Sequence, residues 1–319
     1  MKKMKTILTL GGVLMAASTA LASPFTIGDV FASVGSGLVR EFTPTGTLVQ
    51  TLNTNTSSAN TTGGVFDTSG NFYVTTFASG IVSKFAAGSI SGTNFASVAG
   101  DQESITRDLM NNFFIGQADG GGAITELNST GTLLHTFTAA VGPRGTDWVD
   151  LAADQTTIYY TSEGGTIRRF STIGAGSQLS NFTSAGTQMY ALRILADGGV
   201  IAADTSNVLR FDSTGAIVKT YTIPGASLLF ALNLDPDGVT AWTGDLSTNM
   251  VTRFNIGTGA IVSQWSAGAG TLAGLTVFGE ITQGGGGGST TPEPGTFVLL
   301  GISGATLALA RRRRFKTRN

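Results

Sequence analysis

The sequence predicts an all-β protein built as a six-bladed β-propeller. Three observations support this prediction: the composition, a repeat of a little over 40 residues, and a spare strand after the last repeat. Only 12% of the 319 residues are charged, whereas Gly numbers 45. Apolar and polar residues alternate in short runs between clusters of Gly, Asn, Asp and Ser. This pattern is typical of antiparallel strands joined by tight turns.

The chain begins with a segment that we expect to be removed. Basic residues at 2, 3 and 5 precede an apolar stretch, Thr6–Ala17, and Ala20 and Ala22 form an A-x-A cleavage pattern. These regions, in this order, are typical of a secretory signal peptide, and the apolar stretch is too short to span a membrane. We predict that residues 1–22 direct export through the Sec machinery and are cut after Ala22. The alternative, an amphipathic amino-terminal helix of a cytosolic protein, fits these regions less well.

The repeat is marked by an apolar-x-x-aromatic (or Leu) pattern that occurs six times. Its copies are Val39–Phe42, Val82–Phe85, Ile124–Leu127, Ile167–Phe170, Val208–Phe211 and Val251–Phe254. Four of the six copies are followed by a Thr-Gly turn and a further apolar run, and most are preceded by two more such runs. Each repeat therefore contains about four strands. Such a sheet cannot bury both of its faces alone, but sheets arranged radially can bury one another.

The clearest copy lies within Gly198–Tyr221. Two apolar runs, Val200–Ala203 and Val208–Phe211, are separated by a polar loop at 204–207, and a Ser-Thr-Gly turn leads to a third run, Ala216–Tyr221. Runs of four to six residues between turn-forming clusters predict three consecutive strands of one blade.

The ends of the repeat array indicate how the ring closes. We predict a propeller at 23–282 and a Gly/Ser/Thr linker at 283–291. The six repeats of the propeller are expected near 25–60, 61–102, 103–146, 147–188, 189–230 and 231–271. The first copy lacks the innermost strand, and the spare apolar segment Leu272–Ile281 resembles that strand. If this segment joins the first blade, no sheet edge stays exposed and residues near 25 and 280 are neighbours. An open solenoid or a pair of β-sandwiches would not require it.

One repeat is similar to a known family. Asp197–Thr220 resembles an NHL-type propeller repeat, and Asp235–Gln264 does so more loosely. Propellers of this kind include scaffolds, ligand binders, lactonases and lyases, so the resemblance implies a fold and not an activity.

The carboxyl-terminal segment, 292–319, contains three dissimilar elements. The tripeptide Pro292, Glu293 and Pro294 precedes an uncharged stretch, Thr296–Ala310. The basic residues that follow are Arg311, Arg312, Arg313 and Arg314, then Lys316 and Arg318. The uncharged stretch is shorter than the roughly 17–25 residues of a spanning helix, but arginine side chains that reach to the interface can extend it. The basic cluster fixes this end of the predicted helix on the cytoplasmic side.

In this order and spacing, residues 292–319 closely resemble the PEP-CTERM sorting domain. The resemblance implies that an exosortase, a membrane processing enzyme of Gram-negative bacteria, recognises the Pro-Glu-Pro tripeptide and that the tail is removed after export. It also implies transient anchoring in the inner membrane and later residence in the cell envelope, on the outer surface or in the extracellular matrix. The family is associated with exopolysaccharide and biofilms. The alternative is a plain tail anchor that is not processed.

Charge and residue counts exclude several classes of function. The chain has no Cys and a single His, His135, so thiol chemistry and a multi-histidine metal site within one chain are excluded. From the end of the predicted signal peptide through Glu293, 10 Lys and Arg face 20 Asp and Glu, a net charge of about −10. We therefore expect no nucleic-acid partner, since phosphate binding relies on clustered cations. An acidic exopolysaccharide would have to bind through hydroxyl groups or bridging divalent cations.

Acidic residues follow the second strand in four consecutive repeats. They are Asp119, Glu163, Asp204 and Asp245. In a propeller these loops share one rim with the loops between blades, which contain Glu103, Arg144 and Asp147. Carboxylates that converge there can hold Ca²⁺ or bind a cationic or hydroxyl-rich ligand. The alternative is that each acid bonds the backbone of its own loop, as Asx turns do. We predict no cofactor besides this candidate Ca²⁺.

Two further features bear on catalysis. Asp147 and Asp150 flank Trp148 and have the spacing of a candidate general acid and base. The alternative is that Asp147 is a loop residue and Trp148 packs between blades. His135 is expected on an exposed outer strand, which disfavours a histidine-dependent lyase. The sequence thus favours a non-enzymatic, exported, envelope- or exopolysaccharide-associated binding or scaffold protein. The alternative is a metal-dependent lactonase or hydrolase of the six-bladed type.

Overall fold

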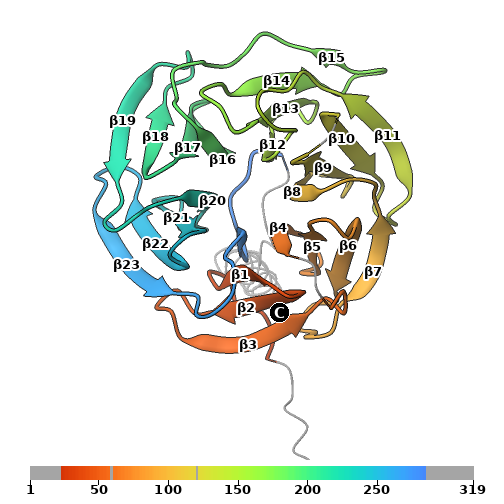
Figure 1. Cartoon of the computed structure of the whole chain (residues 1–319), viewed down its shortest axis with the longest axis vertical. Helices are drawn as coiled ribbons and strands as arrows, with labels where there is room; N and C mark the ends of the chain where they lie inside the picture. The colour runs from red at the N-terminus through yellow and green to blue at the C-terminus, as the bar shows by residue number, and fades with distance from the viewer. Residues whose placement is uncertain (1–22, 58–59, 120, 285–319) are drawn as a thin grey trace, which may run out of the picture.

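The protein forms a ring of six four-stranded antiparallel sheets in the computed structural model (Figure 1). The structure describes residues 23–57, 60–119 and 121–284. The prediction of an all-β, six-bladed propeller is therefore confirmed. The predicted signal peptide with Ala20 and Ala22, most of the predicted linker and the whole segment from Pro292 onward lie outside the described residues. Within the part of the chain that is described, no helix is long and apolar enough to cross a membrane.

Five blades are each built from four consecutive strands, with the first strand nearest the axis. Blade 2 contains β4 (Thr61–Phe66), β5 (Phe72–Thr76), β6 (Ile81–Phe85) and β7 (Thr93–Ser97). Blade 3 contains β8 (Gln102–Arg107), β9 (Phe113–Gln117), β10 (Ala123–Leu127) and β11 (Leu133–Thr138). Blade 4 contains β12 (Val149–Leu151), β13 (Thr157–Tyr160), β14 (Arg168–Ser171) and β15 (Ser177–Gln178). Blade 5 contains β16 (Met189–Ile194), β17 (Val200–Asp204), β18 (Asn207–Phe211) and β19 (Ile217–Thr222). Blade 6 contains β20 (Leu229–Leu234), β21 (Thr240–Asp245), β22 (Met250–Asn255) and β23 (Ile261–Ser266).

Blade 1 combines strands from both ends of the propeller. Its order is β24 (Gly274–Val277), β1 (Val30–Gly35), β2 (Leu38–Phe42) and β3 (Leu48–Asn53). The ring centroids of Phe25 and Phe278 lie 6.4 Å apart. The expected closure by the spare strand is therefore observed, and blade 1 has its innermost strand.

Burial falls from the axis to the periphery. All residues of the innermost strands β8, β16 and β20 are buried, whereas most residues of the outermost strands β11 and β19 are exposed. The last residue of the repeated pattern is buried in every blade: Phe42, Phe85, Leu127, Phe170, Phe211 and Phe254. The repeat is therefore a packing pattern, in which one large apolar side chain per blade fills the space between neighbouring sheets.

The Thr-Gly turns of the repeat require glycine. Gly131 and Gly215 have φ values of +84° and +85°, in the region that side chains with a Cβ rarely adopt. A Cβ on Gly215 would also lie 2.4 Å from the carbonyl oxygen of Phe182 in the preceding blade. The same turn therefore both reverses the chain and lets blades approach each other.

Four of the innermost strands carry a register shift near their amino-terminal ends. The shifts lie between Thr61 and Gly64, Gln102 and Ser104, Met189 and Leu192, and Leu229 and Ala231. Such bulges re-aim individual side chains relative to a regular strand. Here they mark one rim of the propeller, at the place where the innermost strands begin.

Candidate functional site

The candidate site is a cavity at the mouth of the propeller axis, on the rim where the innermost strands begin. One equivalent position in each blade surrounds the axis there: Ala273, Thr62, Glu103, Asp147, Tyr190 and Phe230. Five of these residues line a cavity of about 350 Å³, and all six blades contribute to it. We call this cavity the mouth. Its walls combine acidic, aromatic and hydroxyl side chains, because the equivalent position holds a different residue in each blade.

Arg144 organises the acidic side of the mouth. Its guanidinium donates to both carboxylate oxygens of Asp119, at 3.0 and 2.6 Å, and to Glu163 Oε1 at 3.1 Å. The predicted rim acids Asp119 and Glu163 are thus brought together, by an arginine from the loop before β12. Burial alone would lower the pKa of Arg144, but the hydrogen bond to Asp119 and the surrounding carboxylates raise it. Arg144 is therefore a fixed positive charge among several acids.

Two acids at this level are deeply buried: Glu103, which lines the mouth, and Asp147, which occupies the equivalent position in the next blade. They are only 3% and 2% exposed. Glu103 Oε2 and both carboxylate oxygens of Asp147 have no hydrogen-bond partner. Burial, opposed by Arg144, raises the pKa of Glu103 to about 8, and burial and the nearby Glu103 and Glu163 raise that of Asp147 to about 9. Both acids thus retain protons near neutral pH, and the described residues leave these oxygens without a hydrogen-bond partner.

The aromatic side of the mouth consists of Tyr190 and Phe230. Their ring centroids lie 5.4 Å apart with an angle of 42° between the ring planes. Both side chains line the mouth. Burial and the nearby Glu163, Asp204 and Asp147 raise the pKa of Tyr190. The sequence pattern did not single out this pair. The signal that could have found it is the equivalent position of Tyr190 and Phe230 in two successive repeats.

The other two predicted rim acids bind backbone amides. Asp204 accepts from the N–H groups of Thr187 and Gln188, at 2.7 and 3.1 Å, and from the Thr187 hydroxyl. Asp245 accepts from four N–H groups, those of Ser227, Leu228, Ser247 and Thr248, at 2.6–3.0 Å. These hydrogen bonds tie the loop after the second strand to the segment before the first strand of the same blade. The structure therefore does not join Asp204 and Asp245 to the Asp119–Arg144–Glu163 cluster.

Asp147 and Asp150 do not form a pair. Asp150 Oδ1 accepts from the N–H of Leu151 at 3.0 Å, and Oδ2 from that of Ile194 at 2.9 Å. Burial raises the pKa of Asp150 to about 6, partly offset by Arg193. Asp147, in contrast, has the mouth acids as its electrostatic neighbours. Trp148 is 2% exposed and belongs to the large hydrophobic core.

A buried ion pair lies farther along the axis from the mouth. Arg193 Nε and Nη2 donate to the two carboxylate oxygens of Glu280 at 2.7 and 3.3 Å. Glu280 also accepts from the Asn233 side chain at 2.8 Å and from the N–H of Leu234 at 2.7 Å. This network joins the closing segment after β24 to blades 5 and 6, so its evident role is structural.

His135 lies on the outer strand β11, with its side chain 55% exposed. Its Nδ1 lies 2.8 Å from Glu126 Oε2. His135 is therefore at the periphery and far in the fold from the innermost strands. Among residues 23–57, 60–119 and 121–284, no group of three or more His, Cys, Asp or Glu side chains is arranged to hold a metal ion.

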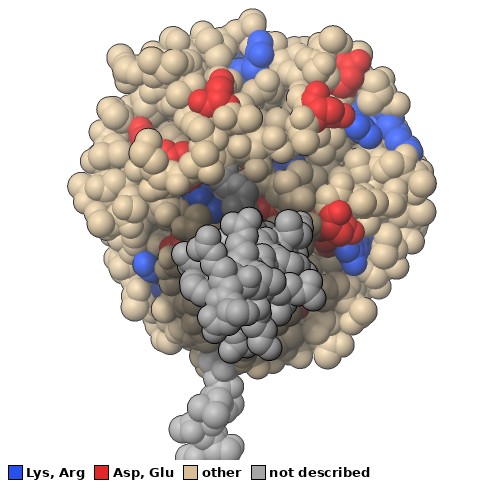
Figure 2. All heavy atoms as spheres, turned by 180° about the vertical axis from the view of Figure 1, so that it is seen from behind, with Lys and Arg blue, Asp and Glu red and all other residues tan. Residues whose placement is uncertain are grey.

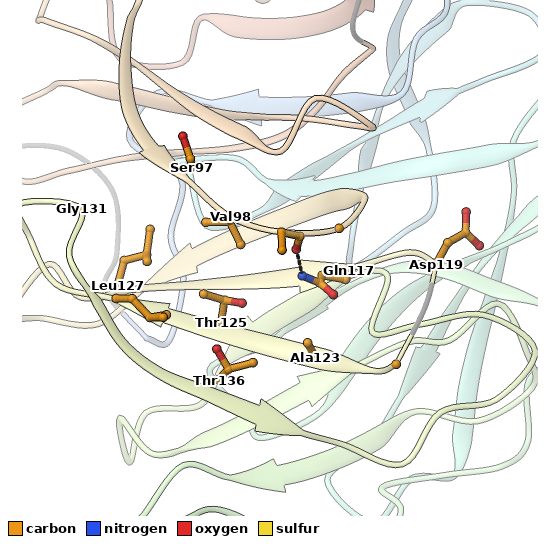
Figure 3. Close-up of a pocket in the computed structure, with 13 residues that line it drawn as sticks. Ser97, Val98, Gln117, Asp119, Ala123, Thr125, Leu127, Gly131 and Thr136 are labelled. Atoms are coloured by element: carbon orange, nitrogen blue, oxygen red, sulfur yellow. Dashed lines mark hydrogen bonds between the residues drawn. The ribbon is translucent and has the colours of Figure 1, made fainter.

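A second hollow lies at the boundary between blades 2 and 3 (Figure 3). It has a volume of about 460 Å³ and is lined mainly by Ser, Thr, Gly and small apolar residues. Gln117 donates to the carbonyl oxygen of Ala99 across it. Asp119, at its edge, is the single charged residue of the lining and is already bonded to Arg144. The mouth therefore concentrates more chemically distinctive groups than this larger hollow.

Charged side chains are sparse on the face opposite to that of Figure 1 (Figure 2). Lys and Arg occur there in small groups, several of them beside Asp or Glu, within a largely uncharged surface. Clustered cations of the kind that bind nucleic-acid phosphates are not visible on this face.

Several solved structures share the fold at low sequence identity. A structure titled as a nidogen/laminin complex has a TM-score of 0.63 and 13% identity, covering 78% of this chain and 97% of that one. The WD40 β-propeller domain of Doa1 has a TM-score of 0.58 and 14% identity, covering 77% and 81%. A streptogramin B lyase has a TM-score of 0.53 and 16% identity, covering 79% and 85%. At these identities the comparisons show the fold alone. No curated protein matches the sequence.

The carboxyl-terminal segment matches a family model. Residues 290–314 match the PEP-CTERM protein-sorting motif. The chain therefore carries this motif together with a six-bladed propeller and is an exported propeller protein that is sorted to the cell surface.

Proposed function

We propose that the protein is a non-enzymatic binding or scaffold protein of the cell envelope or its exopolysaccharide, which an exosortase sorts through the Pro292-Glu293-Pro294 tripeptide. The observation that carries this proposal is the sorting motif at 290–314, placed after a closed propeller. In this proposal the signal peptide directs export through Sec, and Arg311, Arg312, Arg313 and Arg314 hold the tail in the inner membrane of a Gram-negative bacterium until the tail is processed.

The propeller supplies the binding part of the proposed function. A ring of six sheets presents a rigid rim, and its mouth gathers groups from every blade into one concave surface. Rigid scaffolds with concave, partly apolar mouths that contain a few polar groups are common ligand sites. The acidic character of the propeller supports a partner that is neutral or cationic at the contact surface.

The experiment that tests sorting replaces Pro292, Glu293 and Pro294 by Ala in the full chain. The matched control replaces the neighbouring Ser289, Thr290 and Thr291 by Ala. We expect the first variant to accumulate in the inner membrane with its tail intact, whereas the control reaches the outer surface like the unaltered protein. Cell fractionation and immunoblotting measure the distribution. An unchanged distribution of the first variant would refute recognition by an exosortase.

A hydrolysis assay tests the non-enzymatic part of the proposal. Purified protein is incubated with a panel of lactones, with and without Ca²⁺ or Zn²⁺. We expect no turnover above the uncatalysed rate. Turnover that depends on an added metal ion would instead support the alternative of a metal-dependent lactonase.

A further inference from the structure

Glu103 and Asp147 are buried acids with carboxylate oxygens that accept no hydrogen bond. Glu103 lines the mouth and is 3% exposed, yet its Oε2 has no hydrogen-bond partner. Asp147 is 2% exposed, and neither of its carboxylate oxygens has one. Leaving a buried polar group unpaired destabilises the folded state, because the group has lost its hydrogen bonds to water. Groups of this kind are therefore rare in folded proteins and point to a missing partner.

Arg144 does not supply that partner. Its Nε, Nη1 and Nη2 atoms are bonded to Asp119 and Glu163. Four acids surround this one cation. Asp119 and Glu163 are hydrogen-bonded to it, whereas Glu103 and Asp147 interact with it only at longer range. The acidic side of the mouth therefore has an excess of negative charge whenever these acids are ionised, and a positive group would complement it.

The aromatic side of the mouth favours an organic cation. Tyr190 in blade 5 and Phe230 in blade 6 occupy the positions equivalent to Glu103 in blade 3, and both rings line the same cavity. Aromatic faces attract ammonium groups through the ring quadrupole, and they also pack against carbon. A metal ion would use the acids but would leave these rings without a role.

We propose that the mouth binds a small organic ammonium ion, whose nitrogen is held by Glu103 and whose carbon body packs against Tyr190 and Phe230. This inference rests on the proposed binding function, because it names the class of ligand for the same site. An N–H of a primary ammonium group can donate to the unpaired carboxylate oxygen of Glu103.

Binding of an ammonium ion should be linked to proton release. The charged groups that act on Glu103 are Arg144 and Asp147 from the segment before β12, Glu163 after β13, Asp119 after β9 and Asp101 before β8. Burial and the acids in this set raise the pKa of Glu103 to about 8, despite Arg144. A bound cation stabilises the ionised form, so the proton leaves as the ligand enters. Below pH 8, affinity should therefore rise roughly tenfold per pH unit for each proton released.

The test is calorimetric titration of the purified full chain with n-butylammonium between pH 6 and pH 8. Alkyl ammonium groups resemble the lysine side chain, with a pKa of about 10.4, and stay charged throughout this range. n-Butanol is the neutral control ligand, and CaCl₂ is the metal control. We expect binding of n-butylammonium that strengthens about tenfold per pH unit, a heat that depends on the buffer because protons are released, and weak or no binding of n-butanol.

Two variants assign the site. Glu103→Gln keeps the size of the side chain and is expected to weaken binding at least tenfold at pH 8 and to reduce its pH dependence. Asp212→Asn is the matched control, since Asp212 is a half-buried turn acid in blade 5 and its loss changes the net charge equally. Phe230→Leu is expected to weaken binding several-fold without changing the pH dependence.

Three results would overturn this proposal: equal binding by Glu103→Gln and the unaltered protein, equal binding of n-butanol and n-butylammonium, or tight Ca²⁺ binding that Glu103→Gln abolishes. None of them bears on sorting, which is measured in cells by the alanine variants of the Pro-Glu-Pro tripeptide. Failure of the ligand inference and failure of the sorting proposal are therefore distinguishable.

Discussion

Val277 of β24 lies opposite Val30 of β1, so the last described strand completes the blade that the first one begins. Both residues are buried, at 1% and 0% exposure. This pairing holds the ring closed and also fixes the level at which Ala273 reaches the mouth. The stability of the ring and the geometry of the candidate site therefore depend on the same strand.

Substitution of the closing strand should destabilise the whole propeller. Leu275 is fully buried in β24, and Leu275→Ala should lower the free energy of unfolding by about 2–5 kcal/mol through lost burial and a residual cavity. Leu133→Ala is the matched control, because Leu133 is 58% exposed on β11 and should change stability by less than about 0.5 kcal/mol. Urea denaturation measures both. Similar effects of the two substitutions would contradict the role assigned to β24.

Breaking the buried ion pair Arg193–Glu280 should lower the free energy of unfolding far more than breaking an exposed ion pair. Glu280→Ala leaves the guanidinium of Arg193 buried without its carboxylate, which should cost about 3–5 kcal/mol of unfolding free energy. Arg210→Ala removes the more exposed pair with Asp197 and should cost at most about 1 kcal/mol. Thermal and urea unfolding compare the two variants, and equal losses would count against the structural role of Glu280.

Stability should decrease as pH rises through the range in which the mouth acids ionise. The pKa of Glu103 is raised from 4.5 to about 8, so between these values the folded protein holds a proton that the unfolded chain has released. The stability from this proton is complete below about pH 4.5 and is lost as pH rises through 8. Asp147 acts in the same direction up to about pH 9. Glu103→Gln should therefore flatten the pH dependence of Tm. At pH 8 it should raise Tm by a few degrees, which corresponds to a gain in unfolding free energy on the order of 1 kcal/mol.

The control for this pH dependence is Asp212→Asn. Hydrogen bonds from Thr214 and from backbone amides lower the pKa of Asp212, so this acid is ionised throughout the range from pH 5 to pH 9. Its substitution should leave the slope of Tm against pH unchanged in this range. A slope that stays the same in Glu103→Gln would show that Glu103 does not titrate as the structure indicates.

Asp245 should stabilise its blade through its backbone hydrogen bonds and not through a metal ion. Asp245→Ala leaves four N–H groups without their acceptor and should cost about 2 kcal/mol, whereas Asp119→Ala, which breaks a half-exposed ion pair, should cost less than about 1 kcal/mol. Addition of Ca²⁺ or of a chelator should leave the Tm of the unaltered protein unchanged. A fall in Tm with the chelator would favour the Ca²⁺ interpretation of the rim acids.

The fold could be predicted from the sequence because its determinants are periodic. The buried residue that ends each repeated pattern, such as Phe211 or Phe254, recurs with the blade, and the spare segment around Leu275 has no place in the ring except in blade 1. Hydrophobic alternation and turn residues carry this information locally. Closure then follows from the need to cover the sheet edges.

The candidate site could be predicted only in part. The rim of acids and linking loops was expected, but the pairing of Asp119 and Glu163 through Arg144 depends on side-chain directions that spacing does not define. Tyr190 and Phe230 have the same apolar character as core residues. Their place at the mouth results from the bulges in β16 and β20, which single-sequence periodicity does not reveal.

The most direct test of the account is the intact mass of the protein isolated from the cell-envelope and outer-surface fractions. If the signal peptide is cut as predicted, the mature chain begins after Ala22. If an exosortase also processes the tail, the mature chain lacks Arg311, Arg312, Arg313 and Arg314. A mature protein that still ends at Asn319 and retains these arginines would contradict the account.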